Sequence, residues 1–158
     1  KALSWLLKAR IGGNPMAQEY QRMLNSSPDG RFTAEQRHQF WLEKAAELGH
    51  AGAMAKLGFL YTDGIAVEQD FDQAFAWYSK AAKLGDVDAL YNLGVFYLNG
   101  WGTAPDRTMA KQYLAAASAQ GDPAAEQALQ QLLAQDITHR SKDLALTGEK
   151  EHYTTRSV

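Results

Sequence analysis

The stretch AWYSKAAKLGDVDALYNLGVFYLNG at residues 76–100 dictates the architecture, because it repeats FWLEKAAELGHAGAMAKLGFLYTDG at residues 40–64 with a spacing of 36 residues. The same spacing relates further positions, among them Trp5, Trp41 and Trp77, Gly13, Gly49, Gly85 and Gly121, Leu57 and Leu93, and Tyr61 and Tyr97. Self-similarity at one fixed spacing indicates a repeat protein, whose units bury their hydrophobic faces by stacking on one another.

Each unit predicts a pair of helices. The first helix is expected at 52–63 and 87–99, because apolar residues such as Ala53, Leu57 and Tyr61 recur there at helical spacing. The second helix is expected at 71–84 and 107–120, directly after aspartates that are suited to cap a helix N-terminus. The sequence therefore predicts an all-α fold of helix pairs with a 36-residue period.

Repeated glycines indicate where the helices end and where they pack closely. Gly64 and Gly100 follow the first helix of each unit and fit a left-handed C-terminal cap. Gly58 and Gly94 lie in the middle of that helix, where glycine costs about 1 kcal/mol relative to alanine. Their recurrence predicts that the paired helix lies too close for a Cβ atom.

The repeat spacing divides the chain into a solenoid at 1–135 and a polar C-terminal tail at 136–158. Within the solenoid we expect a degenerate unit at 15–48, clear units at 52–85 and 88–121, and a half unit at 122–135. The composition of the tail is typical of a mobile segment. If the tail is ordered instead, Leu144, Leu146 and Tyr153 are the apolar side chains expected to anchor it.

Composition excludes several classes of protein. The net charge of -2 and the pI of about 6.1 argue against a nucleic-acid-binding protein. The absence of cysteine excludes disulfides, thiolate metal sites and a cysteine nucleophile. No apolar run approaches the roughly 20 residues of a membrane-spanning helix, so we expect no direct membrane insertion. The chain begins with Lys1 rather than methionine, which suggests a processed protein or a piece of a longer one.

Three segments resemble the Sel-one-like repeat (SLR) family, which is related to the tetratricopeptide repeats: AFAWYSKAAKLG at 74–85, AMAKLGFLYTDG at 53–64 and ALYNLGVFYLNG at 89–100. The last unit departs from the pattern, with Tyr113 in place of tryptophan and Ala116 in place of lysine, which suggests a capping unit. The resemblance implies a right-handed α–α superhelix of antiparallel helix pairs with a concave groove. It also implies an adaptor protein, in which the motif residues are structural.

The groove is expected on the face of the first helices that lies opposite their buried stripe. At about 100° per residue, Ala55, Phe59 and Thr62 point outward in one unit. An apolar ribbon crosses the middle units on this face, and exposed apolar patches mark binding sites. The alternatives are that the tail or a neighbouring helix covers the ribbon, or that it is ordinary core. The candidate partner-binding residues are Met23, Phe59, Thr62, Asp88, Tyr91, Asn92, Val95, Leu98 and Trp101.

Catalysis is not expected. The sequence has no phosphate-binding loop, no GxSxG or HExxH motif, and no histidine spacing suited to a metal, so we expect no catalytic residue, metal or cofactor. The leading hypothesis is a non-enzymatic scaffold or adaptor that binds a partner protein (a peptide, helix or domain) in the groove. The alternatives are an immunity or inhibitor protein that neutralises a secreted effector or toxin enzyme, and an extracytoplasmic recognition domain of a larger bacterial protein. A soluble protein of the bacterial periplasm or cytoplasm is expected, and the sequence does not choose between these compartments.

Overall fold

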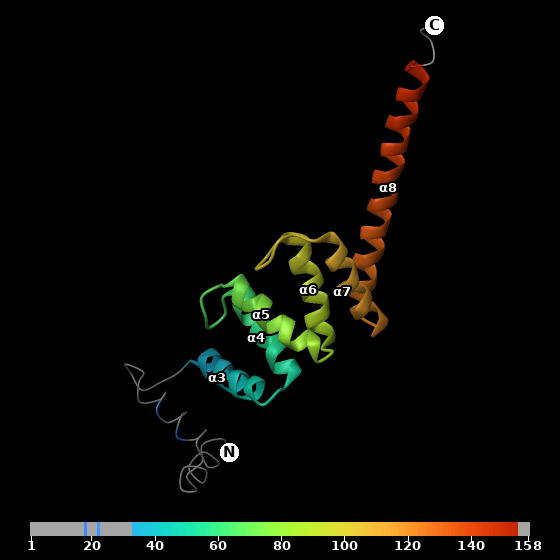
Figure 1. Cartoon of the computed structure of the whole chain (residues 1–158). Helices are drawn as coiled ribbons and strands as arrows, with labels where there is room; N and C mark the ends of the chain where they lie inside the picture. Colours follow the sequence, from blue (N-terminus) through green and yellow to red (C-terminus); the bar gives the residue numbers. More distant parts are fainter. Residues whose placement is uncertain (1–17, 19–21, 23–32, 155–158) are drawn as a thin grey trace.

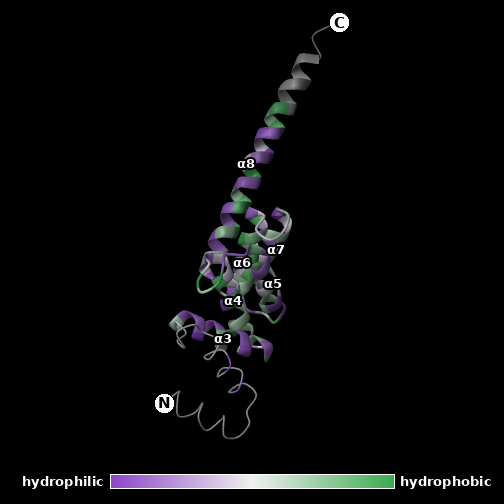
Figure 2. Cartoon of the chain, turned by 90° about the vertical axis from the view of Figure 1, so that its left-hand side faces the viewer, coloured by the Kyte–Doolittle hydropathy of each residue, from purple (hydrophilic) through white to green (hydrophobic). Residues whose placement is uncertain are grey.

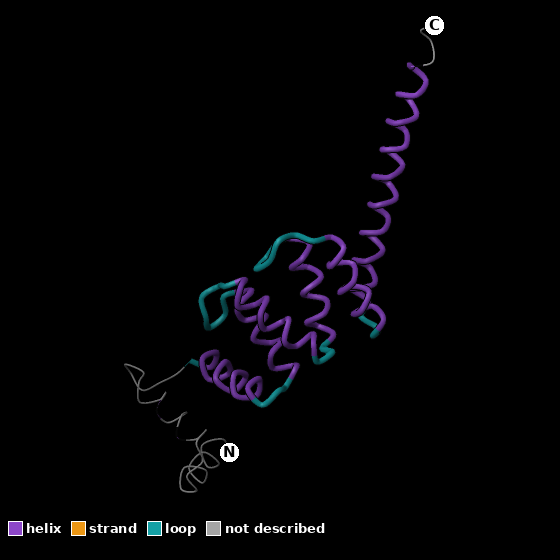
Figure 3. Tube along the Cα trace, in the orientation of Figure 1, coloured by secondary structure: helices purple, strands orange, loops and turns teal. Residues whose placement is uncertain are grey.

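The computed structural model describes residue 18, residue 22 and residues 33–154, with side chains described through Leu146. Between residues 33 and 154 the chain consists of helices joined by turns and loops and contains no strand (Figures 1 and 3). The helices are α3 (Ala34–Glu47), α4 (Ala51–Asp63), α5 (Phe71–Lys83), α6 (Val87–Asn99), α7 (Arg107–Ala119) and α8 (Pro123–Thr154). The expected all-α architecture of helix pairs is confirmed.

Aspartate side chains begin four of these helices, as the repeat predicts. Asp70 accepts hydrogen bonds from two backbone N–H groups of α5, and Asp106 does the same for α7. Asp86 accepts one from Ala89 in α6, while Asp122 accepts two in the first turn of α8. These bonds satisfy N–H groups that have no partner within a helix. At α4 the cap is His50, which makes no such bond.

Glycines end the first helix of each unit and bring its partner close, as predicted. Gly64 and Gly100 adopt left-handed backbone angles, with φ of 68° and 71°. A Cβ atom at Gly58 would lie 2.8 Å from the ring of Tyr78 on α5. The paired helix therefore packs directly against the backbone of α4, and the same arrangement recurs between α6 and α7.

The core runs through the stack as three adjoining clusters. Helix α4 contributes Leu57, and α6 contributes Leu93, each with at most 1% of its surface exposed. Facing them, α5 and α7 supply fully buried alanines, namely Ala74, Ala81, Ala110 and Ala117. Small residues on the second helices let consecutive units approach closely, and the 36-residue repeat thereby produces one continuous core.

Helix α8 differs from the sequence expectation, because no break separates a half unit from a tail. A single helix runs from Pro123 to Thr154 and stands well beyond the other helices (Figure 1). The position one repeat after Gly100 is Asp136, so the residue that ends α6 has no counterpart in α8. Leu144 and Leu146, two of the three expected anchors, are more than 60% exposed, and the side chain of Tyr153 lies outside the described residues.

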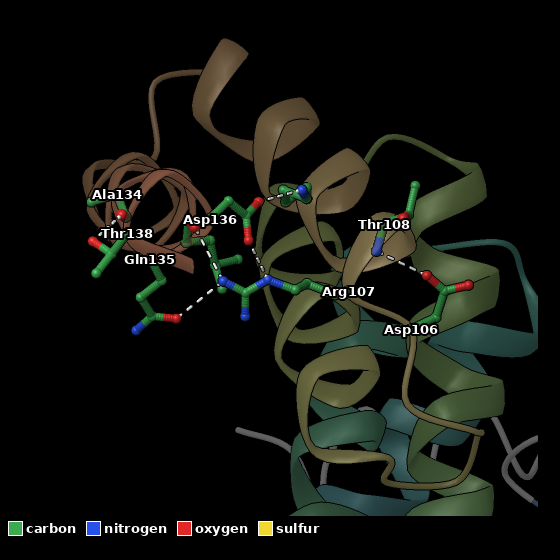
Figure 4. Close-up of polar contacts among 9 residues, drawn as sticks. Asp106, Arg107, Thr108, Ala134, Gln135, Asp136 and Thr138 are labelled. Atoms are coloured by element: carbon green, nitrogen blue, oxygen red, sulfur yellow. Dashed lines mark hydrogen bonds and ion pairs between the residues drawn. The ribbon is translucent and has the colours of Figure 1, made fainter. Parts of the chain in front are cut away.

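Polar contacts with α7 hold the middle of α8 in place (Figure 4). The carboxylate of Asp136 accepts from Arg107 Nε at 2.8 Å and from Lys111 Nζ at 2.6 Å. Arg107 also donates to the carbonyl of Leu132 and to the side chain of Gln135. The two cations lower the pKa of Asp136 below its ordinary value, with Lys111 as the larger cause. Asp136 therefore stays ionised and joins α8 to the solenoid.

Candidate functional site

A pocket of about 320 Å³ lies between the first helices of the two clear units. Helices α4 and α6 form its walls, and the Tyr78 side chain of α5 also lines it. Its lining residues are Gly52, Ala55, Lys56, Phe59, Tyr78, Asp88 and Asn92. Phe59 keeps 50% of its surface exposed, whereas Ala55 and Tyr78 of the same pocket are buried. An exposed aromatic ring at the mouth of a concave pocket is a suitable anchor for a binding partner.

Gly58 explains how Tyr78 reaches a pocket formed by other helices. The ring of Tyr78 lies against the α4 backbone at Gly58, where any side chain would block it. Tyr78 is 1% exposed and packs edge-to-face on Phe96 at 5.4 Å. Burial raises the pKa of Tyr78 to about 12, partly offset by a hydrogen bond with Thr62. The phenol is therefore neutral across the physiological range and serves as a rigid floor rather than as an acid or base.

Charges of both signs surround this floor. Asp88 lines the pocket opposite Lys56. Asp63 and Asp88 both contribute to raising the pKa of Tyr78, which places their carboxylates near its hydroxyl group. The side-chain amide of Asn92 donates one hydrogen bond to the carbonyl of Asp88 and leaves its oxygen available as an acceptor. A ligand here would meet an apolar floor edged by one cation, carboxylates and an amide.

The structure brings only part of the predicted set together. Phe59, Asp88 and Asn92 line the pocket. Tyr91 and Leu98 are half-buried against the cluster formed by α6, α7 and α8. Neighbouring helices therefore cover part of Tyr91 and Leu98, which is one of the alternatives given for the apolar ribbon.

The remaining candidates lie elsewhere. Thr62 donates its hydroxyl hydrogen to the carbonyl of Gly58 at 2.8 Å. Val95 is half-buried on α6, while Met23 lies outside the described residues. Neither Thr62 nor Val95 lines the pocket.

Trp101 has a packing role that its loop position does not reveal. Its ring stacks on Phe71 at a centroid distance of 5.0 Å and meets Phe96 edge-on at 5.6 Å. It packs against the core cluster formed mainly by α5 and α6. Trp101, a candidate partner-binding residue, is therefore held against the core by apolar contacts with Phe71 of the preceding unit and Phe96 of its own unit.

Three pocket residues, Gly52, Lys56 and Tyr78, were missed by the sequence reasoning, and the orientation of a fourth, Ala55, was misjudged. Lys56 lies three residues before Phe59, so the same helical spacing could have found it. Tyr78 belongs to the second helix and is visible only once the close approach at Gly58 is known. Ala55, expected to face outward, is buried with 6% of its surface exposed, because it lies at the bottom of the concave face.

Comparison with known protein families matches the Sel1 repeat to residues 39–50, 51–86 and 87–122. The chain belongs to the Sel1 repeat family. The matches at 51–86 and 87–122 each coincide with a helix pair and start at its first helix, whereas the match at 39–50 covers part of α3 and the turn after it. Sel1 repeats are protein-interaction repeats without catalytic function of their own. Comparison with curated proteins finds no match.

Solved structures of bacterial Sel1 proteins share the fold. A Sel1 repeat protein from Oxalobacter formigenes is 34% identical over 83% of this chain and 38% of its own, with a TM-score of 0.64. c5321, a protective antigen present in uropathogenic Escherichia coli strains, is 26% identical over 78% of this chain and 27% of its own, with a TM-score of 0.60. This Sel1 chain thus spans well under half the length of either protein.

The Helicobacter pylori cysteine rich protein B is 27% identical over 78% of this chain and 89% of its own, with a TM-score of 0.55. The present Sel1 chain reaches a similar arrangement without any cysteine.

Within the described part of this Sel1 chain, no group of three or more histidine, aspartate or glutamate side chains is arranged to hold a metal ion. None of the helices described is both long and apolar enough to cross a lipid bilayer.

Proposed function

We propose that this Sel1 chain is a scaffold that holds a partner protein in the groove between α4 and α6. The observation that carries the proposal is Phe59, half-exposed at the mouth of a pocket whose floor is rigid and neutral. The neighbouring Lys56, Asp88 and Asn92 supply polar groups that fix the orientation of a bound segment. A peptide or helix with an apolar side chain, flanked by groups that pair with these polar residues, fits this arrangement.

The inhibitor alternative has weaker support. A toxin-neutralising groove would be expected to be strongly acidic, whereas a lysine and an aspartate both line this pocket. The other alternative, a recognition domain within a larger bacterial protein, stays a hypothesis that is compatible with the same groove.

Replacing Phe59 by alanine tests the proposal. Covering the exposed half of the ring is worth about 1–2 kcal/mol, so we expect partner affinity to fall about 5- to 30-fold. Leu84→Ala is the matched control, because Leu84 is similarly exposed (57%) and lies in a turn outside the pocket. The measurement is quantitative affinity capture from cells of the source organism with wild type, Phe59→Ala and Leu84→Ala side by side.

The expected result is a protein retained by wild type and by Leu84→Ala but depleted with Phe59→Ala. A photo-crosslinking residue at position 59 should then attach to the same protein, and one at position 84 should not. If Phe59→Ala retains every partner at wild-type level, the groove between α4 and α6 is not the binding site.

A further inference from the structure

Charge is divided unevenly between the first and second helices of the two clear units, although hydrophobic and hydrophilic residues are mixed along both (Figure 2). The first helices, α4 and α6, carry one cation, Lys56, and two acids, Asp63 and Asp88. The second helices, α5 and α7, carry one acid, Asp72, and four cations, which are Lys80, Lys83, Arg107 and Lys111. The helices that form the pocket walls are therefore net negative, whereas their partner helices are net positive.

Carboxylates gather at the pocket itself. Asp88 lines it. Asp86 Oδ2 lies 4.0 Å from the position that a Cβ atom of Gly52, another lining residue, would occupy. Asp63 and Asp88 both add to the effect of burial in raising the pKa of Tyr78, which also lines the pocket. A positive group bound in this pocket would thus lie near several carboxylates, and opposite charges attract more strongly where water is partly excluded.

The Asp88 carboxylate forms no ion pair and no hydrogen bond with any residue that the structure describes. Lys56 lines the same pocket, but its ammonium group lies beyond ion-pair distance of this carboxylate. Asn92, one turn further along α6, donates an amide hydrogen to the backbone carbonyl of Asp88 and keeps its own side-chain oxygen available. Helix α6 therefore presents two neighbouring acceptors, a carboxylate and an amide oxygen, to a donor from outside the chain.

An arginine side chain has the chemistry that complements these groups. Its planar guanidinium carries five N–H donors and no acceptor, pairs well with a carboxylate and stacks on aromatic rings. The pocket offers a half-exposed ring in Phe59, a carboxylate in Asp88 and an amide oxygen in Asn92. A guanidinium is also less strongly hydrated than an ammonium group, so it loses less when it moves onto an apolar surface. Arginine therefore suits this combination better than lysine does.

We propose that the partner segment held between α4 and α6 carries an arginine whose guanidinium lies on Phe59 and pairs with Asp88. The inference rests on the proposed function, because it identifies one residue of the partner that this pocket would hold. Asn92 accepts a further hydrogen bond from the same guanidinium. Lys56 is exposed, so its flexible side chain can point into solvent, away from the bound cation. An acidic segment, in contrast, would have only Lys56 to pair with and would be repelled by the aspartates.

Selection of displayed random peptides on the 158-residue chain tests the proposal. Peptides retained by wild type are counter-selected on Phe59→Ala, so that only peptides that depend on the groove remain. We expect arginine to be enriched in these peptides relative to the starting library. The most frequent peptide is then synthesised, and fluorescence anisotropy measures its affinity for wild type and for three variants.

The three variants are chosen to give different results. Asp88→Asn should weaken binding about 3- to 10-fold, because a charge-assisted hydrogen bond is lost from a partly exposed site. Lys56→Gln should leave the affinity unchanged or raise it, because it removes a like charge. Glu68→Gln is the matched control for the change in net charge, since Glu68 is an exposed carboxylate outside the pocket. It should leave binding unchanged, and circular dichroism checks that all three variants are folded.

Changing the peptide tests the same contact on the unaltered chain. Replacing its arginine by glutamine should weaken binding to wild type about as much as Asp88→Asn does, and should have little further effect on that variant. Groove-dependent peptides without enriched arginine overturn the proposal, as do acidic peptides that Lys56→Gln weakens, or equal losses with Asp88→Asn and Glu68→Gln. In those cases the groove is still a binding site. If no selected peptide depends on Phe59, the arginine proposal and the proposed function both fail.

Discussion

Gly94 controls the separation between α6 and α7 at the scale of single atoms. A Cβ atom there would lie 2.6 Å from Leu114 Cγ and 3.3 Å from the carbonyl oxygen of Ala110. Leu114 is completely buried, and the carbonyl belongs to the helix backbone, so neither atom can move independently. Even one methyl group at this position requires α7 to shift as a whole.

Gly94→Ala should therefore lower the free energy of unfolding by about 1–3 kcal/mol, although alanine is the better helix former. Urea denaturation followed by circular dichroism measures the change. Gly52→Ala is the control, because the nearest atom to a Cβ there is 4.0 Å away. That variant should be neutral or up to about 1 kcal/mol more stable. Equal effects of the two substitutions would contradict the close-packing explanation.

Tyr78 links the core to the pH dependence of stability. Its pKa is raised from 10.0 to about 12 by burial, so the folded chain holds the phenol proton more tightly than the unfolded chain. The associated stabilisation is complete below pH 10 and is lost as the pH rises toward 12. We expect this loss to be on the order of 2–3 kcal/mol.

Tyr78→Phe isolates this contribution, since other tyrosines titrate equally in both proteins. The difference in unfolding free energy between wild type and Tyr78→Phe should be constant below pH 10 and should shift in favour of the phenylalanine variant above it. Denaturation curves at several pH values measure the difference. Parallel pH profiles would show that the Tyr78 phenol does not titrate differently in the folded state.

At the scale of the element, α8 depends on Asp136 for its attachment. The carboxylate joins Arg107 and Lys111 of α7 at the point where apolar contacts end. Its pKa is lowered, so the contact is fully formed above the ordinary carboxyl pKa of 3.8 and is lost as the pH falls through the lowered value.

Asp136→Asn should accelerate amide hydrogen exchange in the middle of α8 while exchange in α4 and α5 stays unchanged. The uncharged amide no longer attracts two cations but preserves the size of the side chain. Hydrogen exchange measured by mass spectrometry on wild type and Asp136→Asn tests this at low and high salt. High salt should reduce the difference, since it screens partly exposed ion pairs. Unchanged exchange in the variant would mean that apolar packing alone holds α8.

At the scale of the whole molecule, much of the fold was predictable because each repeat carries its own start and stop signals. The helix expected at 52–63 is observed at Ala51–Asp63, and the aspartate and glycine caps lie where the spacing placed them. Helix α8 was not predictable from composition, since polarity describes solvent exposure rather than backbone conformation. Between Pro123 and Leu146 no further proline and no glycine interrupts the chain, so the helix continues.

The candidate site was less predictable, because helical spacing describes one helix at a time. It placed Phe59, Asp88 and Asn92 on one face, and these three residues line the pocket between α4 and α6. It had no means of showing that α8 packs beside Tyr91, or that Trp101 stacks on Phe71. Those contacts depend on how neighbouring helices meet, which the repeat spacing alone does not encode.

Two positions distinguish α8 from the first helices of the preceding units. Gly94 allows α7 to pack closely on α6, and Gly100 ends α6. The corresponding positions one repeat later hold Gln130 and Asp136. One exchange obstructs the docking of another second helix, and the other removes the turn that would lead into it. These two residues therefore favour the continuation of α8 as a single helix over a turn into a further helix pair. Replacing Gln130 and Asp136 by glycine would allow α8 to end in a turn and to accept a further helix, so that additional repeats could be joined to the solenoid and lengthen it.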